Sequence, residues 1–276
     1  MKKAFCLVSG GIDSTTCLHK AVLDYRPNGI SLDDAMDILH GALTGIEIDW
    51  VEAYSIDYGQ RHKKEGDYAR LTCDSLGIKH QWLKAAPDFA GAVMLTDAQI
   101  EIPNLSYSDI KGVSPTYVPF RNGNLLSLVT ARAQQWVNRQ IWAHGGDKEV
   151  ATALMKDSTG VYFGAHAEDA ANWAYPDCTP EFIGAMANAI YVGTYSCVRL
   201  HTPLEWLSKV EIILLGEHLG VEWKNTWSCY KGDELHCGTC PTCRARKAGF
   251  MGAGVEDPTE YQSDLQLLNP VIRSCQ

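Results

Sequence analysis

The sequence predicts an α/β protein with a doubly wound parallel sheet, followed by a C-terminal segment of a different kind. Strand-like apolar runs alternate with helical patterns between residues 4 and 219, as is typical of such a sheet. The first run, residues 4–8, is continuously apolar, which fits a strand buried on both faces. Beyond Trp227 the periodicity stops and four cysteines crowd together. We therefore expect an α/β domain in residues 1–226 and a separate segment in residues 227–276.

The individual strands and helices are predicted from apolar runs and capping signals. Ser14 is the predicted N-cap of the first helix, and Thr179 places a capping hydroxyl before a proline at a helix start. Ser208 and Glu211 form a capping box, and Gly220 ends the helix that they begin. We expect strands at residues 4–8, 50–56, 78–83, 161–164 and 197–200, and helices at about 14–25, 31–43, 63–76, 122–141, 180–191 and 209–219.

Charge and apolar patterning exclude several classes of protein. Lys and Arg number 24 against 33 Asp and Glu, which gives a formal net charge of −9. Binding to a phosphate backbone depends on surplus cations, so a protein that coats DNA or RNA is disfavoured. Apolar runs fall short of the ~18 residues that a membrane span requires. The apolar stretch after Lys2 and Lys3 is too short for a signal peptide, and a cytoplasmic location is expected.

A glycine loop, SGGIDSTT in residues 9–16, follows the first predicted strand. Gly10 and Gly11 allow a tight turn and the close approach of a ligand. The N–H groups at the start of the next helix favour an anion such as phosphate, and Asp13 can help to hold magnesium. An ordinary strand-to-helix turn is the simpler interpretation. The loop matches neither a Walker A loop, because it lacks the lysine, nor the G-x-G-x-x-G pattern.

Ten cysteines are distributed unevenly along the chain. Close spacing in an intracellular chain favours a closed tetrahedral zinc site with a structural role, and an iron–sulfur cluster is the alternative. His236 is not counted as a ligand, because four cysteines already complete the shell of a zinc ion. The clustered residues are Cys229, Cys237, Cys240 and Cys243, and the scattered ones are Cys6, Cys17, Cys73, Cys178, Cys197 and Cys275.

Cationic residues lie where predicted strands end, which is the edge at which open α/β sheets bind ligands. Arg61 stands in DYGQRH after the second main strand, and Arg121 stands in VPFRN before a long helix. A guanidinium suits a phosphate or a carboxylate, although surface side chains are the simpler interpretation of both arginines. Lys209 lies in the first turn of a capped helix, where it opposes the helix dipole unless an anion compensates.

Two acidic motifs frame a polar loop after the fourth predicted strand. GAHAED contains Glu168 and Asp169, and YPDC contains Tyr175 and Asp177. Carboxylates can accept hydrogen bonds from the N–H edge of a purine-like base, whereas a solvated acidic loop is the simpler interpretation. Cys178 is a weak candidate nucleophile, because the sequence shows no base beside it.

The glycine loop resembles the SGGxDS signature of the PP-loop ATP pyrophosphatases, whose sheet is Rossmann-like. In that family the loop grips the pyrophosphate end of ATP, and the enzyme joins AMP to a substrate oxygen. The resemblance implies that one continuous segment binds ATP. Its residues are Val8, Ser9, Gly10, Gly11, Ile12, Asp13, Ser14, Thr15, Thr16, Cys17 and Leu18.

Six stretches in order from Ser9 to Arg244 resemble the 7-cyano-7-deazaguanine synthases, which form a nitrile in queuosine and related deazaguanine pathways. The resemblance implies an ATP-dependent carbon–nitrogen ligase. ATP activates the carboxylate of 7-carboxy-7-deazaguanine, ammonia gives the amide, and renewed activation with dehydration gives the nitrile. The stretches are SGGIDSTTCL, DYGQRH, VPFRN, YPDCTPEF, TPLEWLSKVEI and SCY…CGTCPTCR.

That reaction fixes the expected roles of the candidate residues. Magnesium, the loop amides, Lys209 and Arg121 would neutralise charge as it develops, so Asp13, Arg121 and Lys209 are the predicted catalytic residues. The resemblance also implies that the four clustered cysteines are zinc ligands and that the chain forms a homodimer. The predicted substrate contacts are Arg61, Glu168, Asp169, Tyr175 and Asp177.

The chain departs from the expected pattern near residues 27–45 and 144–159, which we interpret as insertions. Three other functions stay open: a tRNA-thiolating enzyme of the same superfamily, a zinc-dependent binding module without catalysis, and a relative that adenylates a macromolecule. The net charge of −9 opposes stable nucleic-acid binding, and the intact SGGIDS loop opposes the loss of catalysis.

Overall fold

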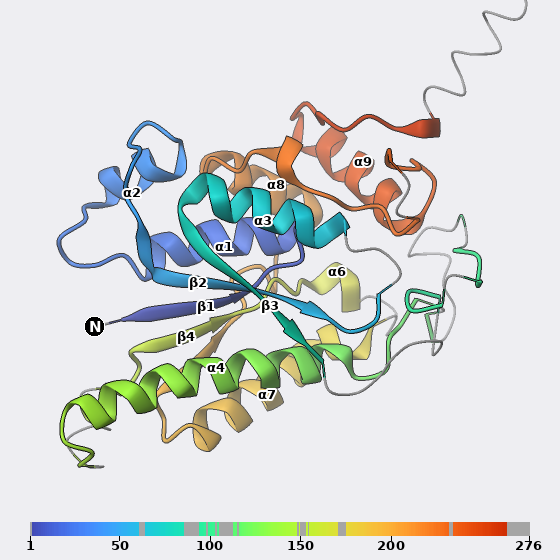
Figure 1. Cartoon of the computed structure of the whole chain (residues 1–276). Coiled ribbons are helices and arrows are strands. Elements are labelled where there is room, and N and C mark those ends of the chain that lie inside the picture. Colours follow the sequence, from blue (N-terminus) through green and yellow to red (C-terminus); the bar gives the residue numbers. More distant parts are fainter. Residues whose placement is uncertain are drawn as a thin grey trace, which may run out of the picture.

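A five-stranded parallel sheet with helices on both faces organises the computed structural model (Figure 1). The structure describes residues 2–60, 64–85, 94–97, 99–102, 104, 113–114, 116–147, 149, 153, 155–170, 175–231 and 234–263. The sheet has the order β3-β2-β1-β4-β5. Its strands are β1 (Lys3–Leu7), β2 (Ile48–Asp57), β3 (Ile78–Lys84), β4 (Thr159–Tyr162) and β5 (Val198–His201).

Helices cover the sheet in two layers, as the doubly wound prediction requires. Figure 1 shows α1, α3 and α8 on one face and α4 and α7 on the other. The described helices are α1 (Ile12–Asp24), α2 (Leu32–Leu39), α3 (Lys64–Leu76), α4 (Arg121–Ala143), α6 (Ala167–Ala170), α7 (Pro180–Gly193), α8 (Lys209–His218) and α9 (Pro241–Ala253), with short 3-10 turns η3 (Pro176–Cys178) and η4 (Trp223–Asn225).

The core divides into one apolar cluster on each side of β1, because successive side chains of a strand point to opposite faces. Phe5 and Leu7 pack with residues of α4, whereas Ala4 and Cys6 pack with residues of α1. All four side chains are buried. The continuously apolar β1 is therefore the central strand, as its sequence predicted.

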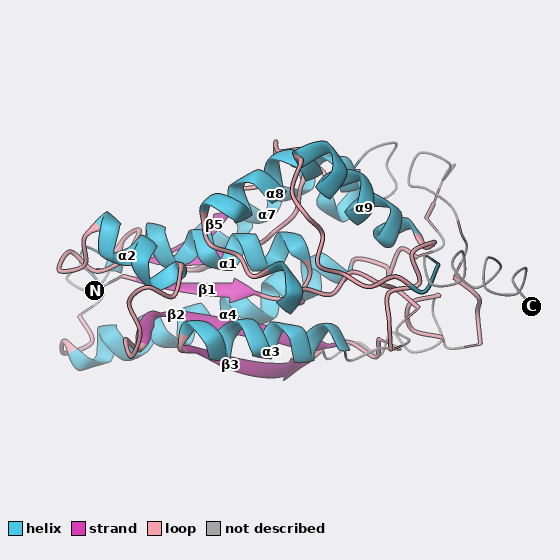
Figure 2. Ribbon diagram, turned by 90° about the horizontal axis from the view of Figure 1, so that it is seen from above, coloured by secondary structure: helices cyan, strands magenta, loops and turns pink. Residues whose placement is uncertain are grey.

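The winding of the chain reverses between β1 and β4. From β1 the chain proceeds outward through β2 to β3, and it then crosses back to β4 on the other side of β1. The connections that leave β1 and β4 diverge, which opens a crevice at the carboxyl ends of these strands. Figure 2 shows these ends pointing toward α9, so the C-terminal segment lies beside the crevice.

The predicted elements are confirmed in type, with shifts at their ends. The predicted N-cap Ser14 is wrong: α1 begins at Ile12 with Gly11 as its N-cap. Helix α2 ends at Leu39, short of the predicted residue 43, because Gly41 takes a positive φ of 69°. Helix α9 was not predicted, since its apolar pattern is weak, although Pro241 stands in the first-turn position that proline favours.

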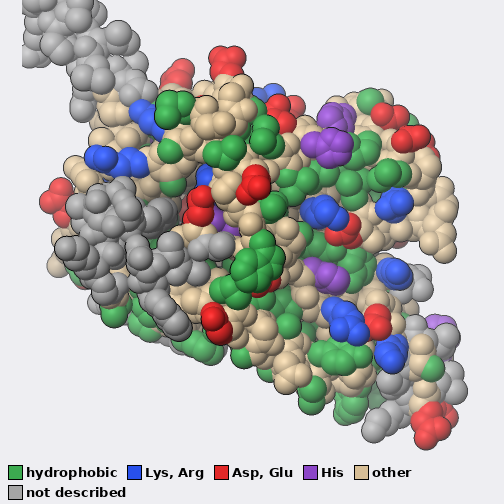
Figure 3. Space-filling view, turned by 180° about the vertical axis from the view of Figure 1, so that it is seen from behind, with side chains coloured by type: hydrophobic (Ala, Val, Ile, Leu, Met, Phe, Trp, Pro, Cys, Tyr) green, Lys and Arg blue, Asp and Glu red, His purple; other side chains and the backbone are tan. Residues whose placement is uncertain are grey.

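The surface contains both signs of charge in a mixed arrangement. In Figure 3 the Lys and Arg side chains of the visible face lie among Asp and Glu rather than in one basic patch. This distribution agrees with the net charge of −9 and offers no continuous basic surface for a phosphate backbone on that face.

Among the described residues, no helix combines the length and the apolar character needed to cross a membrane.

Candidate active site

A cavity of about 260 Å³ lies at the carboxyl edge of the sheet, where β1 and β4 diverge. The glycine loop, the end of β2, the first turns of α3, α4 and α8, and the residues around Trp227 all line it. Besides residues of the predicted ATP-binding segment, the fold brings five predicted catalytic or substrate-binding residues to this one cavity. They are Asp13, Arg121, Glu168, Asp169 and Lys209.

The glycine loop is held by its own hydroxyl groups. Ser9 N donates to Ser14 Oγ at 3.1 Å, and the two serine hydroxyls lie 3.1 Å apart. Ser14 Oγ also donates to Gly11 O at 3.3 Å. Gly10 has a φ of 87°, and a Cβ there would lie 2.1 Å from Glu65 O, so only glycine fits. The loop ends at the N-terminus of α1, where free N–H groups and the helix dipole favour an anion.

Asp13 and Lys209 form an ion pair between the first turns of α1 and α8. Lys209 Nζ lies 2.6 Å from Asp13 Oδ1 and 3.0 Å from His166 Nε2. His166 Nε2 also lies 3.3 Å from Asp169 Oδ2. An ammonium can only donate, so Nε2 accepts and the imidazole carries its proton on Nδ1. Within the described residues, Nδ1 is buried without a partner.

In this cluster, opposite charges shift the pKa values of Asp13 and Lys209 so that both side chains stay ionised. Burial alone would raise the pKa of the Asp13 carboxyl, but the charge of Lys209 and its hydrogen bond hold that pKa below its ordinary value. Burial would lower the pKa of Lys209, but Asp13 and Asp169 raise it. Lys209 therefore stays cationic at neutral pH, and its cost at a helix N-terminus is offset by the carboxylates that face it.

Arg121 forms the opposite wall of the cavity, at the first residue of α4. Its guanidinium lies 5.5 Å from the ring centre of Tyr58, and Nη1 lies 3.4 Å from the Tyr58 hydroxyl. Asn122 N donates to Asp177 Oδ2 at 2.9 Å, and Asn122 Nδ2 donates to Cys178 Sγ at 3.2 Å. These contacts fix the start of α4 against η3, and with it the position of Arg121.

The predicted substrate residues take different positions around this site. Glu168 and Asp169 line the cavity from α6, whereas Asp177 is buried and accepts the backbone N–H of Asn122. Tyr175 is buried too, and its hydroxyl lies 2.5 Å from Thr116 Oγ1. Arg61 lies outside the described residues. Burial raises the pKa of the Cys178 thiol well above its ordinary value, which opposes a nucleophilic role.

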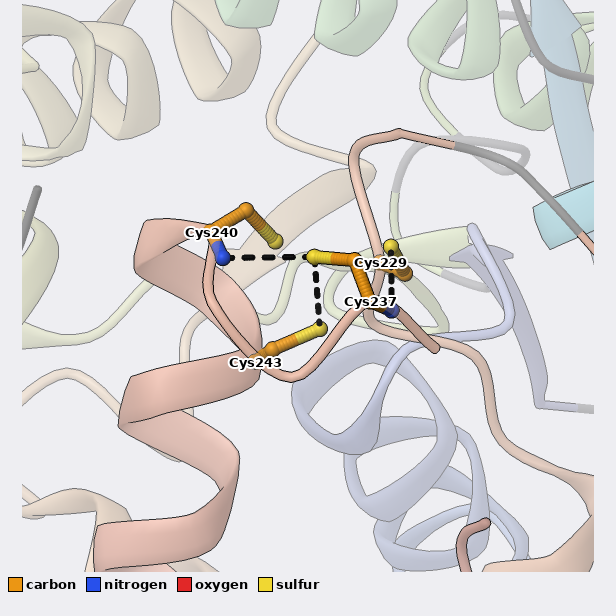
Figure 4. A group of neighbouring side chains, drawn as sticks. All are labelled: Cys229, Cys237, Cys240 and Cys243. Atoms are coloured by element: carbon orange, nitrogen blue, oxygen red, sulfur yellow. Dashed lines mark hydrogen bonds between the residues drawn. The ribbon is translucent and has the colours of Figure 1, made fainter. Parts of the chain in front are cut away.

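The four clustered cysteines come together at the start of α9. Their sulfur atoms all lie within 4.8 Å of one another, and Figure 4 shows them turned toward a common centre. All four residues are buried. Backbone N–H groups of Thr239 and Cys240 donate to Cys237 Sγ at 3.4 and 3.3 Å, as suits a thiolate. The cluster can hold a metal ion, and zinc fits this donor set.

Trp227 joins the cysteine segment to the glycine loop. Its N–H donates to Gly10 O at 2.8 Å, and its indole Nε1 donates to Cys229 O at 2.9 Å. The ring of His236 lies 4.1 Å from the Trp227 ring, and His236 Nε2 accepts Ser228 N–H at 3.0 Å. His236 is thus engaged in packing, which agrees with leaving it out of the metal ligands.

Arg246 anchors the same region from α9. Its side chain is fully buried and pairs with Asp257, with 3.0 Å between Nη2 and Oδ1. It also donates to Thr226 Oγ1 at 2.8 Å and to Trp223 O at 3.3 Å. One buried cation therefore holds α9, the chain after it, and the segment that leads to Trp227.

Sequence reasoning missed several cavity residues, among them Glu65, His166 and Trp227. His166 stands within the GAHAED motif, so its place after a strand end was an available signal. Glu65 lies only four residues beyond Arg61 of DYGQRH. Trp227 had no motif of its own, and only the folded chain shows that it touches both the loop and the cysteines.

Comparison with known proteins gives one family. Residues 38–152 and 148–254 match the family described as Queuosine biosynthesis protein QueC. The 7-cyano-7-deazaguanine synthase of Thermoplasma acidophilum is 37% identical over 95% of this chain and 92% of its own length. That of Alteromonas mediterranea is 35% identical over 93% of this chain and 97% of its own.

A solved structure is similar to this chain: the U34-tRNA thiolase NcsA from Methanococcus maripaludis with its 4Fe-4S cluster. The sequence identity is 15% and the TM-score is 0.34, and the match covers 95% of this chain and 74% of the thiolase chain.

The family match spans most of the described α/β domain and the four cysteines. Together with the relatives, which cover nearly the whole chain, it shows that this protein belongs to the QueC family of queuosine biosynthesis proteins.

Proposed function

We propose that this enzyme converts 7-carboxy-7-deazaguanine and ammonia to 7-cyano-7-deazaguanine, with ATP as the activating substrate. One observation carries the proposal: in a chain of the QueC family, the cavity at the strand reversal gathers the glycine loop, the Asp13–Lys209 pair and Arg121. The named relatives are 7-cyano-7-deazaguanine synthases, a name that states the same product. A nitrile-forming ligase therefore agrees with both the family and the chemistry of the cavity.

The cavity suits the activation of a carboxylate. A carboxylate is a poor electrophile, and joining its oxygen to AMP creates a leaving group. In our proposal the N–H groups after Gly11 and the hydroxyls of Ser9 and Ser14 hold the phosphates of ATP. Lys209 and Arg121 neutralise the charge that develops on them, and Asp13 helps to hold magnesium beside Lys209.

Recognition of the deazaguanine base is proposed for the acidic side of the cavity. Glu168 and Asp169 line it and can accept hydrogen bonds from N–H groups of the base. Arg61 is proposed as a partner of the substrate carboxylate. Tyr175 and Asp177, bonded to Thr116 and Asn122, are proposed to shape the pocket.

A structural zinc ion is proposed for Cys229, Cys237, Cys240 and Cys243, because the four sulfur atoms converge and are buried. A closed site of four thiolates has no position for substrate, so its role is to fix the segment that carries Trp227. A homodimer in the cytoplasm completes the proposal, and sedimentation velocity measures the dimer directly.

Incubation with 7-carboxy-7-deazaguanine, ammonium, ATP and magnesium tests the reaction, with products identified by mass spectrometry. We expect the amide and then the nitrile, with ATP converted to AMP and pyrophosphate. Absence of both products, without substrate-dependent ATP consumption, would overturn the proposal. Thiolation of tRNA instead would establish the other adenylating function. Elemental analysis tests the metal, and iron with acid-labile sulfide would contradict zinc.

A further inference from the structure

The proposed reaction releases protons from nitrogen at two stages, and the inference developed here rests on that proposed function. When ammonia adds to the activated carboxyl carbon, nitrogen must lose a proton. When the activated amide becomes a nitrile, nitrogen must lose both remaining protons. A carboxylate with no other partner is the kind of side chain that can accept them.

Most carboxylates of the cavity are engaged or face solvent. Asp13 is paired with Lys209 at 2.6 Å, and the charge of Asp169 also acts on Lys209, raising its pKa. Glu168 is exposed on α6. Glu65 differs from all three, because it lines the cavity, is half-buried, and makes no hydrogen bond or ion pair with any described residue.

The backbone around Glu65 is fixed against the glycine loop. A Cβ on Gly10 would lie 2.1 Å from Glu65 O and 2.7 Å from Ala69 N, so α3 presses directly on the loop. On the next residue, a Cβ on Gly66 would meet the Trp82 ring at 1.9 Å. Both contacts hold the first turn of α3 in place. The backbone of Glu65 is therefore held at the cavity wall by tight packing on two sides, and Glu65 lines the cavity from there.

The electrostatic surroundings keep this carboxyl reactive near neutral pH. Burial raises the pKa of Glu65 to about 7, and the positive charge of Arg121 on α4 opposes that rise. The Glu65 carboxylate in turn helps to raise the pKa of Tyr58, which lies after β2. A general base works best when its pKa lies near the working pH, so Glu65 can take a proton and return it to water between stages.

We propose that Glu65 is the catalytic base that removes protons from the substrate nitrogen during amide formation and nitrile formation. In the first stage the ammonia lone pair forms the C–N bond. A proton on nitrogen moves to the Glu65 carboxylate, and the C–O bond breaks with its electrons leaving on AMP. In the second stage the amide oxygen is joined to AMP with release of pyrophosphate. Nitrogen then loses its two protons in turn to Glu65, which returns the first to water before it accepts the second; the C≡N bond forms as the C–O bond breaks with its electrons leaving on AMP.

Glu65→Gln tests this role, because glutamine keeps the shape of the side chain and cannot accept the proton. We expect amide and nitrile formation to fall by about 100-fold or more. Substrate-dependent exchange of labelled pyrophosphate into ATP requires only the joining of AMP to the carboxylate, so it should stay within about twofold of the wild type. At fixed free ammonia, wild-type amide formation should rise with pH through about 7, and the variant should lose this rise.

Asp67→Asn is the matched control, since it removes an exposed carboxylate from the same helix and should leave every rate unchanged. Normal amide formation by Glu65→Gln, or an equal loss of pyrophosphate exchange, would overturn the role of Glu65. A wild-type protein that forms no amide or nitrile would instead overturn the proposed function. The two failures are therefore distinguishable.

Discussion

The glycine loop and the cysteine segment reach their structures by different means. The loop lies between a buried strand and a helix, and its shape follows from backbone hydrogen bonds and from the contact of Gly10 with α3. Between Trp227 and the start of α9, the described residues form no named helix or strand, and four buried thiols bring this segment together. Packing between helices and strands thus shapes the glycine loop, whereas the clustered thiols shape the cysteine segment beside it.

The glycine loop and the cysteine segment also differ in the surroundings of their ionisable side chains. Around the loop, Asp13, Lys209 and Arg121 keep their charges at a cavity that a ligand can enter. In the cysteine segment, the thiols are enclosed and face one another. The N–H of Trp227 donates to Gly10 O, so the supporting region is bonded directly to the reactive one. Substitutions in the two regions should therefore differ in how much they reduce zinc content, unfolding free energy and turnover.

The largest effect should come from the loss of a zinc ligand. Cys243→Ser should abolish stoichiometric zinc and expose the C-terminal segment to proteases, because structural zinc can contribute about 10 kcal/mol to folding. Zinc analysis and limited proteolysis measure both. Cys197→Ser changes a buried cysteine of the core outside the cluster, and it should keep its zinc. Retention of zinc by Cys243→Ser would contradict the four-cysteine assignment.

A pair of glycine substitutions separates packing from ligand contact in the loop. Gly10→Ala should destabilise the fold by about 4 kcal/mol, because its Cβ would strike the backbone of α3 at a positive φ. At Gly11 the nearest atom to a Cβ is Trp227 O at an ordinary 3.5 Å, so Gly11→Ala should fold normally and weaken ATP binding. Chemical unfolding and nucleotide titration give the two readouts. Equal stability of both variants would refute the tight contact.

A smaller but clear loss is expected from the buried cation of α9. Arg246→Met leaves Asp257 without its partner and should cost about 3 kcal/mol of unfolding free energy. Arg244→Met, on the same helix, removes an exposed side chain bonded to Thr239 O and should cost under about 1 kcal/mol. Urea denaturation compares them. Similar losses for both would show that Arg246 does not hold the segment.

The smallest effect concerns the pH dependence of the Asp13–Lys209 pair. The folded protein lowers the pKa of Asp13, so its stabilising contribution is present above the unfolded value of about 4 and is lost as pH falls through the folded value. It raises the pKa of Lys209, so that contribution is lost only as pH rises through the folded value. Asp13→Asn should melt below the wild type at pH 7 and converge with it in acid. Parallel melting curves at all pH values would exclude the linkage.

Sequence patterns predicted the parts of the fold that depend on local rules. The apolar run of β1, the capping box of Ser208 and Glu211, and the cysteine spacing each predicted the element that the structure contains. Local rules failed at α9, whose burial depends on packing against α8 and on the pairing of Arg246 with Asp257. They failed also at Ser14, where the hydroxyl bonds within the loop rather than capping the helix.

The α/β class, the glycine loop and the four-cysteine cluster can be predicted from the amino-acid sequence, because each is encoded in residues close along the chain. Which side chains share the cavity is known only from the folded arrangement of the elements. Asp13 and Lys209 are separated by 196 positions, and Glu65 and Arg121 line the same cavity although α3 and α4 cover opposite faces of the sheet. Their ionisation depends on burial and on neighbouring charges, and those quantities exist only once the chain has folded.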